Sequence, residues 1–550
     1  MTTNKLIRKG LLTTVIILLL IIIIQFAFTW YLIPQIKTEL EKEVDVQSKG
    51  TYALSIKKLN INVFTQSIYI KGFNLTPGKN STEQTTNLTM NADQIKLIRF
   101  ELIPLFSKNK LIVNKMEVVN PSAKIFRNTS GYYTAKPDTS LKISLYDILK
   151  KHINSLSIKK ISIYDAAIEV YDNKGDSLPT IGSKENELSV VNFYVNSASN
   201  QSGRLFAADK LDLMIRKFSY RTADSLYSIQ VKQLSASYNE QELVLDSLQV
   251  TPNYTRRNFA NEAGKQTDRF RMEASKVKFE KMNVKMFLER NWFIANLLSI
   301  ENVNISAYRD KNDRRKEVRV PSVQQLIRSI PFYTAIDTIK ISNAAVVYEE
   351  VIEGASKAGK VFLNDMNASI TGLTSDTNLF KNQSLIVNAK GKFMNKGLVK
   401  ARYKFPLNTT QTIFDCSGKM INIPMTALNP MVETNANISL KEGVIDSMLF
   451  SFHANERMAT GEMKLIYHGL KIELINKRTK KSGRLEDVIS FVAHRLVIKE
   501  DNPGKNGEIR ITPISYIRNP NRFIFNYSWK ALLSGIRPVI GIPSAKGENN

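Results

Sequence analysis

The sequence predicts a mostly antiparallel β protein with long strands, preceded by one transmembrane helix. Three observations predict this fold class. Residues 10–36 contain no charged side chain. After them, apolar and polar residues alternate with a period of two, for example from Leu54 to Val63, which is typical of strands with one apolar and one solvated face. Turn-forming residues such as those in 76–80 and 172–176 separate the alternating stretches.

The apolar segment 11–33 is the predicted transmembrane helix, because about 20 apolar residues span a bilayer. Basic residues precede it, so the positive-inside rule places residues 1–10 in the cytoplasm and the rest of the chain across the membrane. A cleaved signal peptide is the alternative, but its apolar region normally has only about 7–15 residues. Residues 34–50 then form a juxtamembrane linker. The predicted membrane anchor includes Val15, Leu19, Ile23, Trp30 and Tyr31.

Composition limits the class of protein further. The chain has 550 residues, which favours several structural units. A single cysteine, Cys416, excludes an intrachain disulfide. The net charge is +27, which suits nucleic acid, anionic lipid or a solubilising surface. The membrane anchor argues against nucleic acid, so a solvated outer face and attraction to anionic headgroups remain.

The alternating pattern places a first β unit at 51–180 and further β units at 181–480, with a helical and strand cap at 481–550. Helices are few. Apolar residues recur at steps of three and four in 145–152, 323–330 and 485–496, which predicts three short amphipathic helices. A fourth is predicted at 520–535 and is described below.

An internal repeat relates residues 109–172 to residues 291–350. Ile161 aligns with Ile339 at an offset of 178, and Arg127 aligns with Arg309 at an offset of 182. The repeated segment also shares a short helix and an Ala-Ala pair. Similarity at a fixed period is typical of stacked arrays, although alternating sequences also resemble each other by chance.

Patterns of catalytic or metal-ligating residues are absent from the sequence. The four histidines stand at no ligand spacing from one another or from Cys416, and no phosphate loop, dinucleotide fingerprint or serine-nucleophile elbow is present. We therefore predict no catalytic, metal or cofactor-binding residues and no enzyme. An enzyme whose carboxylates are brought together only by folding stays open.

The predicted C-terminal helix at 520–535 is amphipathic and basic. Asn519 caps its start, Pro520 takes the first helical position, and Gly535 ends it. Such a helix suits the headgroup boundary of a membrane, or it plugs the end of the β array. The apolar face and its basic flank are formed by Phe525, Trp529, Leu532, Leu533, Ile536, Arg522 and Lys530.

Several stretches together resemble the AsmA-like family of inner-membrane-anchored periplasmic proteins of Gram-negative bacteria. They are 54–61, 68–75, 92–97, 102–106 and 111–125 near the start, and 436–446 and 459–467 near the end. The resemblance implies an elongated, curved, repeating β-groove and a part in outer-membrane lipid homeostasis or lipid transport. It implies an inner-membrane location, with the N-terminus in the cytoplasm and the bulk in the periplasm.

A sheet with one continuous apolar face can shelter acyl chains, since each buried methylene contributes about 0.8 kcal/mol. We therefore expect a phospholipid or another acyl lipid as ligand, the inner membrane as a partner, and an outer-membrane or envelope protein as a further candidate partner. The alternatives are a sealed dry core and a non-enzymatic envelope scaffold. The candidate groove-lining residues are Ile161, Ile163, Ile168, Val170, Ile339, Ile341, Val346 and Tyr348.

Overall fold

The computed structural model describes residues 30–31, 33–62, 64–81, 87–127, 153–173, 175–197, 208–313, 315–435, 437–475 and 498–542. Within these ranges no helix combines the length and the apolar character needed to cross a membrane. Nearly all of the predicted transmembrane segment 11–33, including Val15, Leu19 and Ile23, lies outside the described residues, as do the helices predicted at 145–152 and 485–496.

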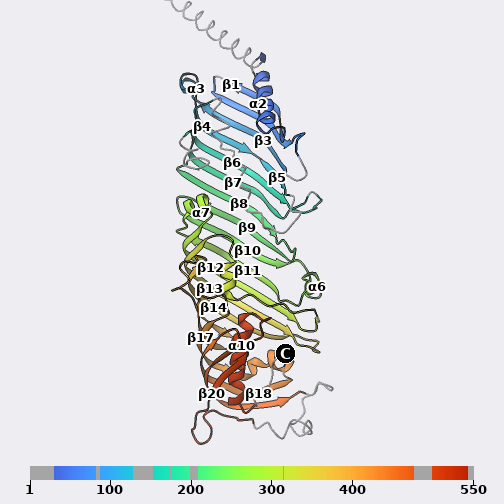
Figure 1. Cartoon of the computed structure of the whole chain (residues 1–550), viewed down its shortest axis with the longest axis vertical. Helices are drawn as coiled ribbons and strands as arrows, with labels where there is room; N and C mark the ends of the chain where they lie inside the picture. Colours follow the sequence, from blue (N-terminus) through green and yellow to red (C-terminus); the bar gives the residue numbers. More distant parts are fainter. Residues whose placement is uncertain are drawn as a thin grey trace, which may run out of the picture. The chain divides into compact units, whose positions relative to one another are not determined.

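The described part of the chain is mostly β, with 20 strands that belong to one largely antiparallel sheet (Figure 1). The chain divides into two compact units. The N-terminal unit comprises Met1–Arg221 with Val231–Glu240, and the C-terminal unit comprises Thr222–Gln230 with Gln241–Asn550.

The N-terminal unit contains two described helices, α2 (Ile33–Gln47) and α3 (Leu102–Lys108). Its strands are β1 (Tyr52–Asn62), β2 (Ser67–Pro77), β3 (Asn87–Phe100), β4 (Lys110–Val119), β5 (Ser122–Phe126), β6 (Ser155–Tyr171), β7 (Ile181–Val195), β8 (Lys210–Arg221) and most of β9 (Tyr227–Ser237). Strands β1, β2 and β3 pair in antiparallel order, and β3 then pairs with both β4 and β5. Strands β4 and β5 both lie parallel to β6, which continues antiparallel to β7 and β8.

The C-terminal unit holds the remaining strands and most of the short helices. The strands are β10 (Glu242–Pro252), β11 (Arg269–Glu280), β12 (Phe293–Asp310), β13 (Thr334–Val351), β14 (Gly359–Thr374), β15 (Ser384–Phe393), β16 (Gly397–Pro406), β17 (Phe414–Pro424), β18 (Ile438–Ala454), β19 (Met458–Leu474) and β20 (Ile511–Ile517). The helices are α6 (Phe259–Glu262), α7 (Val284–Arg290), α8 (Val323–Arg328), the 3₁₀ helix η2 (Met425–Leu428), α9 (Asn429–Asn435) and α10 (Ile524–Val539).

Strand order in this unit follows the chain, so neighbours in sequence are neighbours in the sheet. Strands β10, β11 and β12 pair antiparallel, β12 and β13 pair parallel, and each strand from β13 to β20 pairs antiparallel with the next. Helix α8 lies in the crossover between the parallel strands and starts with a capping box in which Ser322 and Gln325 bond each other's backbone.

The two repeated segments have the same local strand pairing. Met116 opposes Ile161 in the parallel pair β4–β6, and the aligned residues Leu298 and Ile339 oppose each other in the parallel pair β12–β13. The next antiparallel pairings share a register shift at aligned positions. One lies between Ile163 and Ile168 of β6, and the other between Ile341 and Val346 of β13. Both copies therefore build the same β-bulge.

Each bulge depends on a residue with left-handed backbone geometry. Asp165 has φ 53° and the aligned Asn343 has φ 52°, a region that Asp and Asn tolerate better than other side chains. We expect Asn343→Val to lower the free energy of unfolding by about 1–2 kcal/mol more than Asn343→Gly. Both substitutions remove the side-chain amide of Asn343. The difference between their free energies of unfolding, measured with denaturant, therefore isolates the backbone effect. Equal losses would contradict the assignment.

The apolar faces of the strands form the core of each unit. The N-terminal unit packs Ile56, Leu59 and Ile61 of β1 against strands further along the sheet, and Ile33 of α2 joins this cluster. In the C-terminal unit the largest cluster centres on residues such as Phe414, Met463 and Leu465, whose side chains are fully buried. Within the described ranges no second sheet covers these faces.

Candidate functional site

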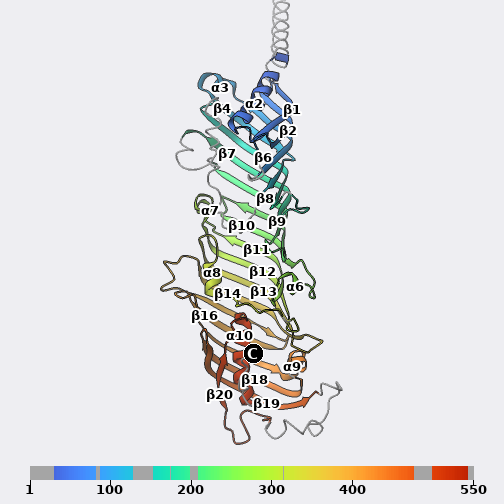
Figure 2. The same ribbon diagram turned by 45° about the vertical axis from the view of Figure 1, so that its right-hand side comes forward.

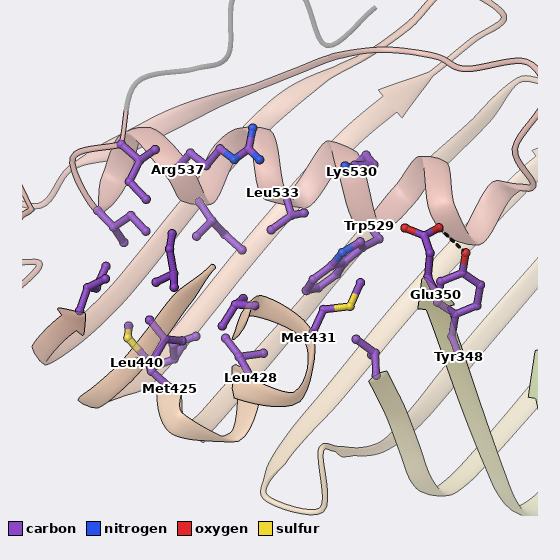
Figure 3. A pocket seen from close by; sticks show the side chains of 18 of the residues that line it. Tyr348, Glu350, Met425, Leu428, Met431, Leu440, Trp529, Lys530, Leu533 and Arg537 are labelled. Carbon is purple, nitrogen blue, oxygen red and sulfur yellow. Dashed lines mark hydrogen bonds between the residues drawn. The ribbon is translucent and has the colours of Figure 1, made fainter. Parts of the chain in front are cut away.

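An apolar pocket of about 520 Å³ lies beneath α10 in the C-terminal unit (Figure 3). Strands β13, β14, β18 and β19 contribute to its lining together with η2, α9 and α10. Most of the lining side chains are aliphatic or aromatic. They include Val361, Met425, Leu428, Met431, Val432, Ile438, Leu440, Ile445, Leu465, Leu470, Ile472, Phe525, Trp529, Leu533, Ile536 and Ile540. The volume falls in the range of about 300–1,000 Å³ that is usual for small-molecule sites.

Helix α10 forms the roof of the pocket, and its two sides contact different parts of the unit. One side is buried against the sheet through residues that include Tyr527, Ala531 and Val539. Figures 1 and 2 both show α10 lying over the C-terminal strands, and it contacts β19 and β20. The other side, with Trp529 and Leu533, faces the pocket.

The predicted helix at 520–535 is present, but its limits and its faces differ from the prediction. It begins after Phe523 and runs through Gly535 to Val539. Gly535 does not end the helix. It lies within α10, on the side that is buried against the sheet. A Cβ at Gly535 would lie 3.1 Å from Ile514 and 3.2 Å from Met463, so a side chain at this position would push these neighbours back by a few tenths of an ångström. Leu532, which the sequence places on the same apolar face as Trp529 and Leu533, is buried in the core cluster instead of lining the pocket.

Tyr527 fixes the helix to the strands. Its side chain is 2 % exposed, and its hydroxyl donates a hydrogen bond of 3.0 Å to the carbonyl oxygen of Asn455. The ring meets that of Phe414 edge-on, with 5.8 Å between the centroids. This contact holds the roof of the pocket at a fixed distance from the sheet.

The floor is formed by η2, α9 and the apolar faces of β18 and β19 (Figure 3). Met425 and Met431 come from the short helical segment that links β17 to β18. Methionine side chains are flexible and polarisable, so they adapt to irregular apolar ligands. Asn429 anchors this segment, because its side chain bonds both the N–H and the carbonyl of Leu440.

One end of the pocket is polar. The hydroxyl of Tyr348 donates a 2.7 Å hydrogen bond to Glu350, and Lys311 lies 2.8 Å from the other oxygen of that carboxylate. Burial alone would raise the pKa of Glu350, but Lys311 and Tyr348 outweigh it and lower this pKa. Burial and the neighbouring carboxylate raise the pKa of the Tyr348 phenol. At neutral pH this end therefore presents a protonated phenol and an ionised carboxylate whose charge is balanced by Lys311.

A buried ionic network joins the start of α10 to strands β11–β13. Arg309 is 3 % exposed and lies 3.2 Å from Asp268, while Arg522 pairs with Glu317. Burial raises the pKa of the Asp268 carboxyl, and Arg309 opposes this rise. Burial lowers the pKa of Arg522, and the positive charge of Arg309 lowers it further. The charges compensate each other away from solvent and hold the polar end of the pocket in place.

The structure brings together residues from two separate sequence predictions. Tyr348 belongs to the predicted groove lining. It lies beside Phe525 of the C-terminal helix, with 6.5 Å between the ring centroids. The helix residues Phe525, Trp529, Lys530, Leu533 and Ile536 also line the pocket, whereas Arg522 belongs to the ionic network.

The other predicted groove residues lie elsewhere on their strands. Ile339 and Ile341 belong to a core cluster with Ile336 and Leu298, and Val346 lies half-buried further along β13. In the N-terminal unit, Ile161 packs at the edge of the core and Val170 is buried. Ile163 is half-buried, and Ile168 is 41 % exposed. Of the anchor residues, Trp30 and Tyr31 are described, and both are exposed.

Sequence reasoning missed the floor residues Met425, Leu428 and Met431. Residues 425–435 form two short consecutive helices between strands, too short to give a clear helical period. The dipeptide Asn429-Pro430 was the one sequence signal in this segment, because Asn-Pro marks a turn and so indicates an interruption between strands.

Within the described residues, the thiol of Cys416 is buried, and two imidazole groups lie beside aspartates. Burial raises the pKa of the Cys416 thiol to about 12, so the thiolate nucleophile is not formed at neutral pH. His453 and His468 each lie 2.9 Å from an aspartate, Asp415 and Asp446, on exposed strand surface. Across the described ranges, no group of three or more His, Cys, Asp or Glu side chains has the geometry to hold a metal ion.

Comparison with known proteins leaves the family open: no family model matches the chain, and no curated protein matches it.

Proposed function

We propose that this chain is a membrane-anchored lipid-binding protein whose C-terminal unit holds an acyl chain in the pocket beneath α10. The observation that carries the proposal is the apolar pocket itself, with an adaptable methionine-containing floor and a polar end at Tyr348 and Glu350. Ligands with long hydrocarbon tails match such a lining, because each methylene transferred from water to an apolar site contributes about 0.8 kcal/mol.

Three further features support lipid over other apolar ligands. Lys530 and Arg537 lie at the edge of the pocket (Figure 3), where positive charge suits a phosphate headgroup. The apolar segment 11–33 would keep the protein at the bilayer that supplies the ligand. The loose sequence similarity to AsmA-like proteins points to the same class of ligand. We infer a location in the inner membrane with the bulk in the periplasm, and a role in envelope lipid homeostasis or transport without enzymatic chemistry.

The test is photo-crosslinking of lipid to the full chain. The protein is reconstituted in phosphatidylcholine vesicles containing a phospholipid with a diazirine on its acyl chain, and cross-linked peptides are mapped by mass spectrometry. We expect cross-links in peptides containing Trp529 and Leu533. The variant Leu533→Trp should lose at least nine-tenths of them, since the indole fills space that the acyl chain needs.

The matched control is Leu449→Trp, because Leu449 is 45 % exposed and does not line the pocket. It introduces the same side chain and should keep the cross-links. Thermal unfolding of both variants checks that each is folded. Cross-links confined to residues outside the pocket, or equal labelling of the two variants, would refute the proposal.

A further inference from the structure

A second concave feature crosses the strands of the C-terminal unit away from the pocket. It is a trough of about 750 Å³ that runs over β13, β14, β15, β16 and β17. Its lining contains several cationic side chains and no carboxylate. The cationic residues are Lys340, Lys390, Lys400, Arg402 and Lys419.

Strand register places these cations in two rows on one face of the sheet. Lys390 opposes Lys400, and Lys400 opposes Lys419, so three neighbouring strands carry lysines directly side by side. The second row, two residues along each strand, contains Lys340 and Arg402, separated by Ser369 and Asn388. Residues two apart on a strand share a face, so both rows border the same trough.

Directly opposed like charges destabilise a sheet. Lys390, Lys400 and Lys419 are all exposed, and within the described chain no hydrogen bond or ion pair is formed by the ammonium group of any of them. Two carboxylates on the strands of the trough have other partners: Asp365 of β14 pairs with Lys392, and Asp415 of β17 bonds His453. A row of uncompensated lysines is thus a cost to the isolated chain that an anionic partner would relieve.

The neutral residues of the trough indicate which kind of anion fits. Ser369, Asn388 and Ser417 share one row with Lys340 and Arg402. Serine and asparagine side chains both donate and accept hydrogen bonds, which a peptide backbone requires. A phosphate array needs donors alone, and a flat bilayer surface does not enter a trough.

We propose that this trough binds an extended acidic peptide segment of a partner protein, with its carboxylates on the two cationic rows and its backbone against the serine and asparagine side chains. The surface is separate from the pocket beneath α10, so the inference does not depend on lipid binding. A lipid-handling protein anchored in one membrane would gain from such a surface a means to recruit a protein partner.

The test is a titration of the full chain in neutral detergent with a fluorescent twelve-residue peptide of alternating Glu and Ser, followed by anisotropy. We expect saturable binding that weakens at least tenfold between 50 and 300 mM salt, as for exposed ion pairs. The triple variant Lys390→Glu, Lys400→Glu, Lys419→Glu should weaken binding at least tenfold further. The matched control changes three exposed lysines outside the trough: Lys285→Glu, Lys357→Glu and Lys381→Glu.

Equal loss in the two triple variants would mean a non-specific charge effect and would overturn the proposal. A second arm adds dihexanoyl phosphatidylglycerol as a soluble lipid headgroup. Unlabelled acidic peptide should displace the probe, and this lipid at equal charge concentration should not. Displacement by the lipid alone would assign the trough to headgroups instead. Lipid cross-linking in the pocket should be unchanged in the trough variant, which separates the failure of one proposal from that of the other.

Discussion

Replacing Tyr527 by Ala should lower the free energy of unfolding of the C-terminal unit by about 3–5 kcal/mol, the usual cost of removing a buried aromatic side chain. The phenol is 2 % exposed and lies between α10 and the sheet, in contact with the rings of Phe414 and Tyr516. Without it, the contact that holds the roof of the pocket is lost. Urea unfolding of the full chain measures the stability, and the acyl-chain cross-links should disappear with the roof.

Tyr527→Phe is the matched control. It keeps the ring and removes only the hydrogen bond to the carbonyl oxygen of Asn455, which is worth about 1 kcal/mol. We expect this variant to retain the lipid cross-links. If Ala and Phe cause similar losses of stability, the hydroxyl, and not the packing of the ring, holds the helix.

The Arg309→Met variant should be destabilised by about 3 kcal/mol at pH 7, because it leaves the carboxylate of Asp268 buried without its nearest partner. The loss should depend on pH. Burial already raises the pKa of Asp268 above its ordinary value. When folding raises the pKa of a carboxyl, the folded protein holds that proton more tightly than the unfolded chain does. The stability that this group contributes is fully present below its unfolded pKa of about 3.9. It is lost as pH rises through the folded-state pKa.

Removing Arg309 raises the pKa of Asp268 further, so the difference between variant and parent should grow as pH rises above about 4 and shrink below it. Denaturant unfolding between pH 3 and pH 8 measures this. The double variant Arg309→Met, Asp268→Asn removes both charges and should recover part of the stability at pH 7. A pH-independent loss, or a double variant less stable than Arg309→Met, would contradict the argument.

Much of the fold could be read from the sequence because strand periodicity is a local signal. The alternation from Leu54 to Asn62 became β1, and the predicted helix at 323–330 is α8, which ends before Pro331. The repeat was visible for the same reason. Its bulges require residues that tolerate positive φ, and Asp165 and Asn343 stand at aligned positions.

The pocket could be predicted only in part, because it depends on contacts between distant residues. Tyr348 and Trp529 lie 181 positions apart in sequence, and the docking of α10 over the sheet brings them to one cavity. The predicted C-terminal limit of α10 was wrong because glycine commonly ends a helix. Gly535 instead lies within the helix, close to Ile514 and Met463. No local pattern distinguishes a stop glycine from a packing glycine. Helix α3 was missed because it is short and contains Pro104.

The sequential order of strands β13 to β20 has a consequence for how the polypeptide reaches its native state. Each strand pairs with the one just synthesised. From β13 to β19 these hairpins close short loops, so the assembly of these strands proceeds without a long search for partners, whereas β20 follows β19 after a longer connection. Helix α10 follows the last of these strands. Its docking therefore comes at the end of assembly, and the nascent C-terminal unit passes through a stage in which the apolar surface beneath α10 is uncovered before the helix closes over it.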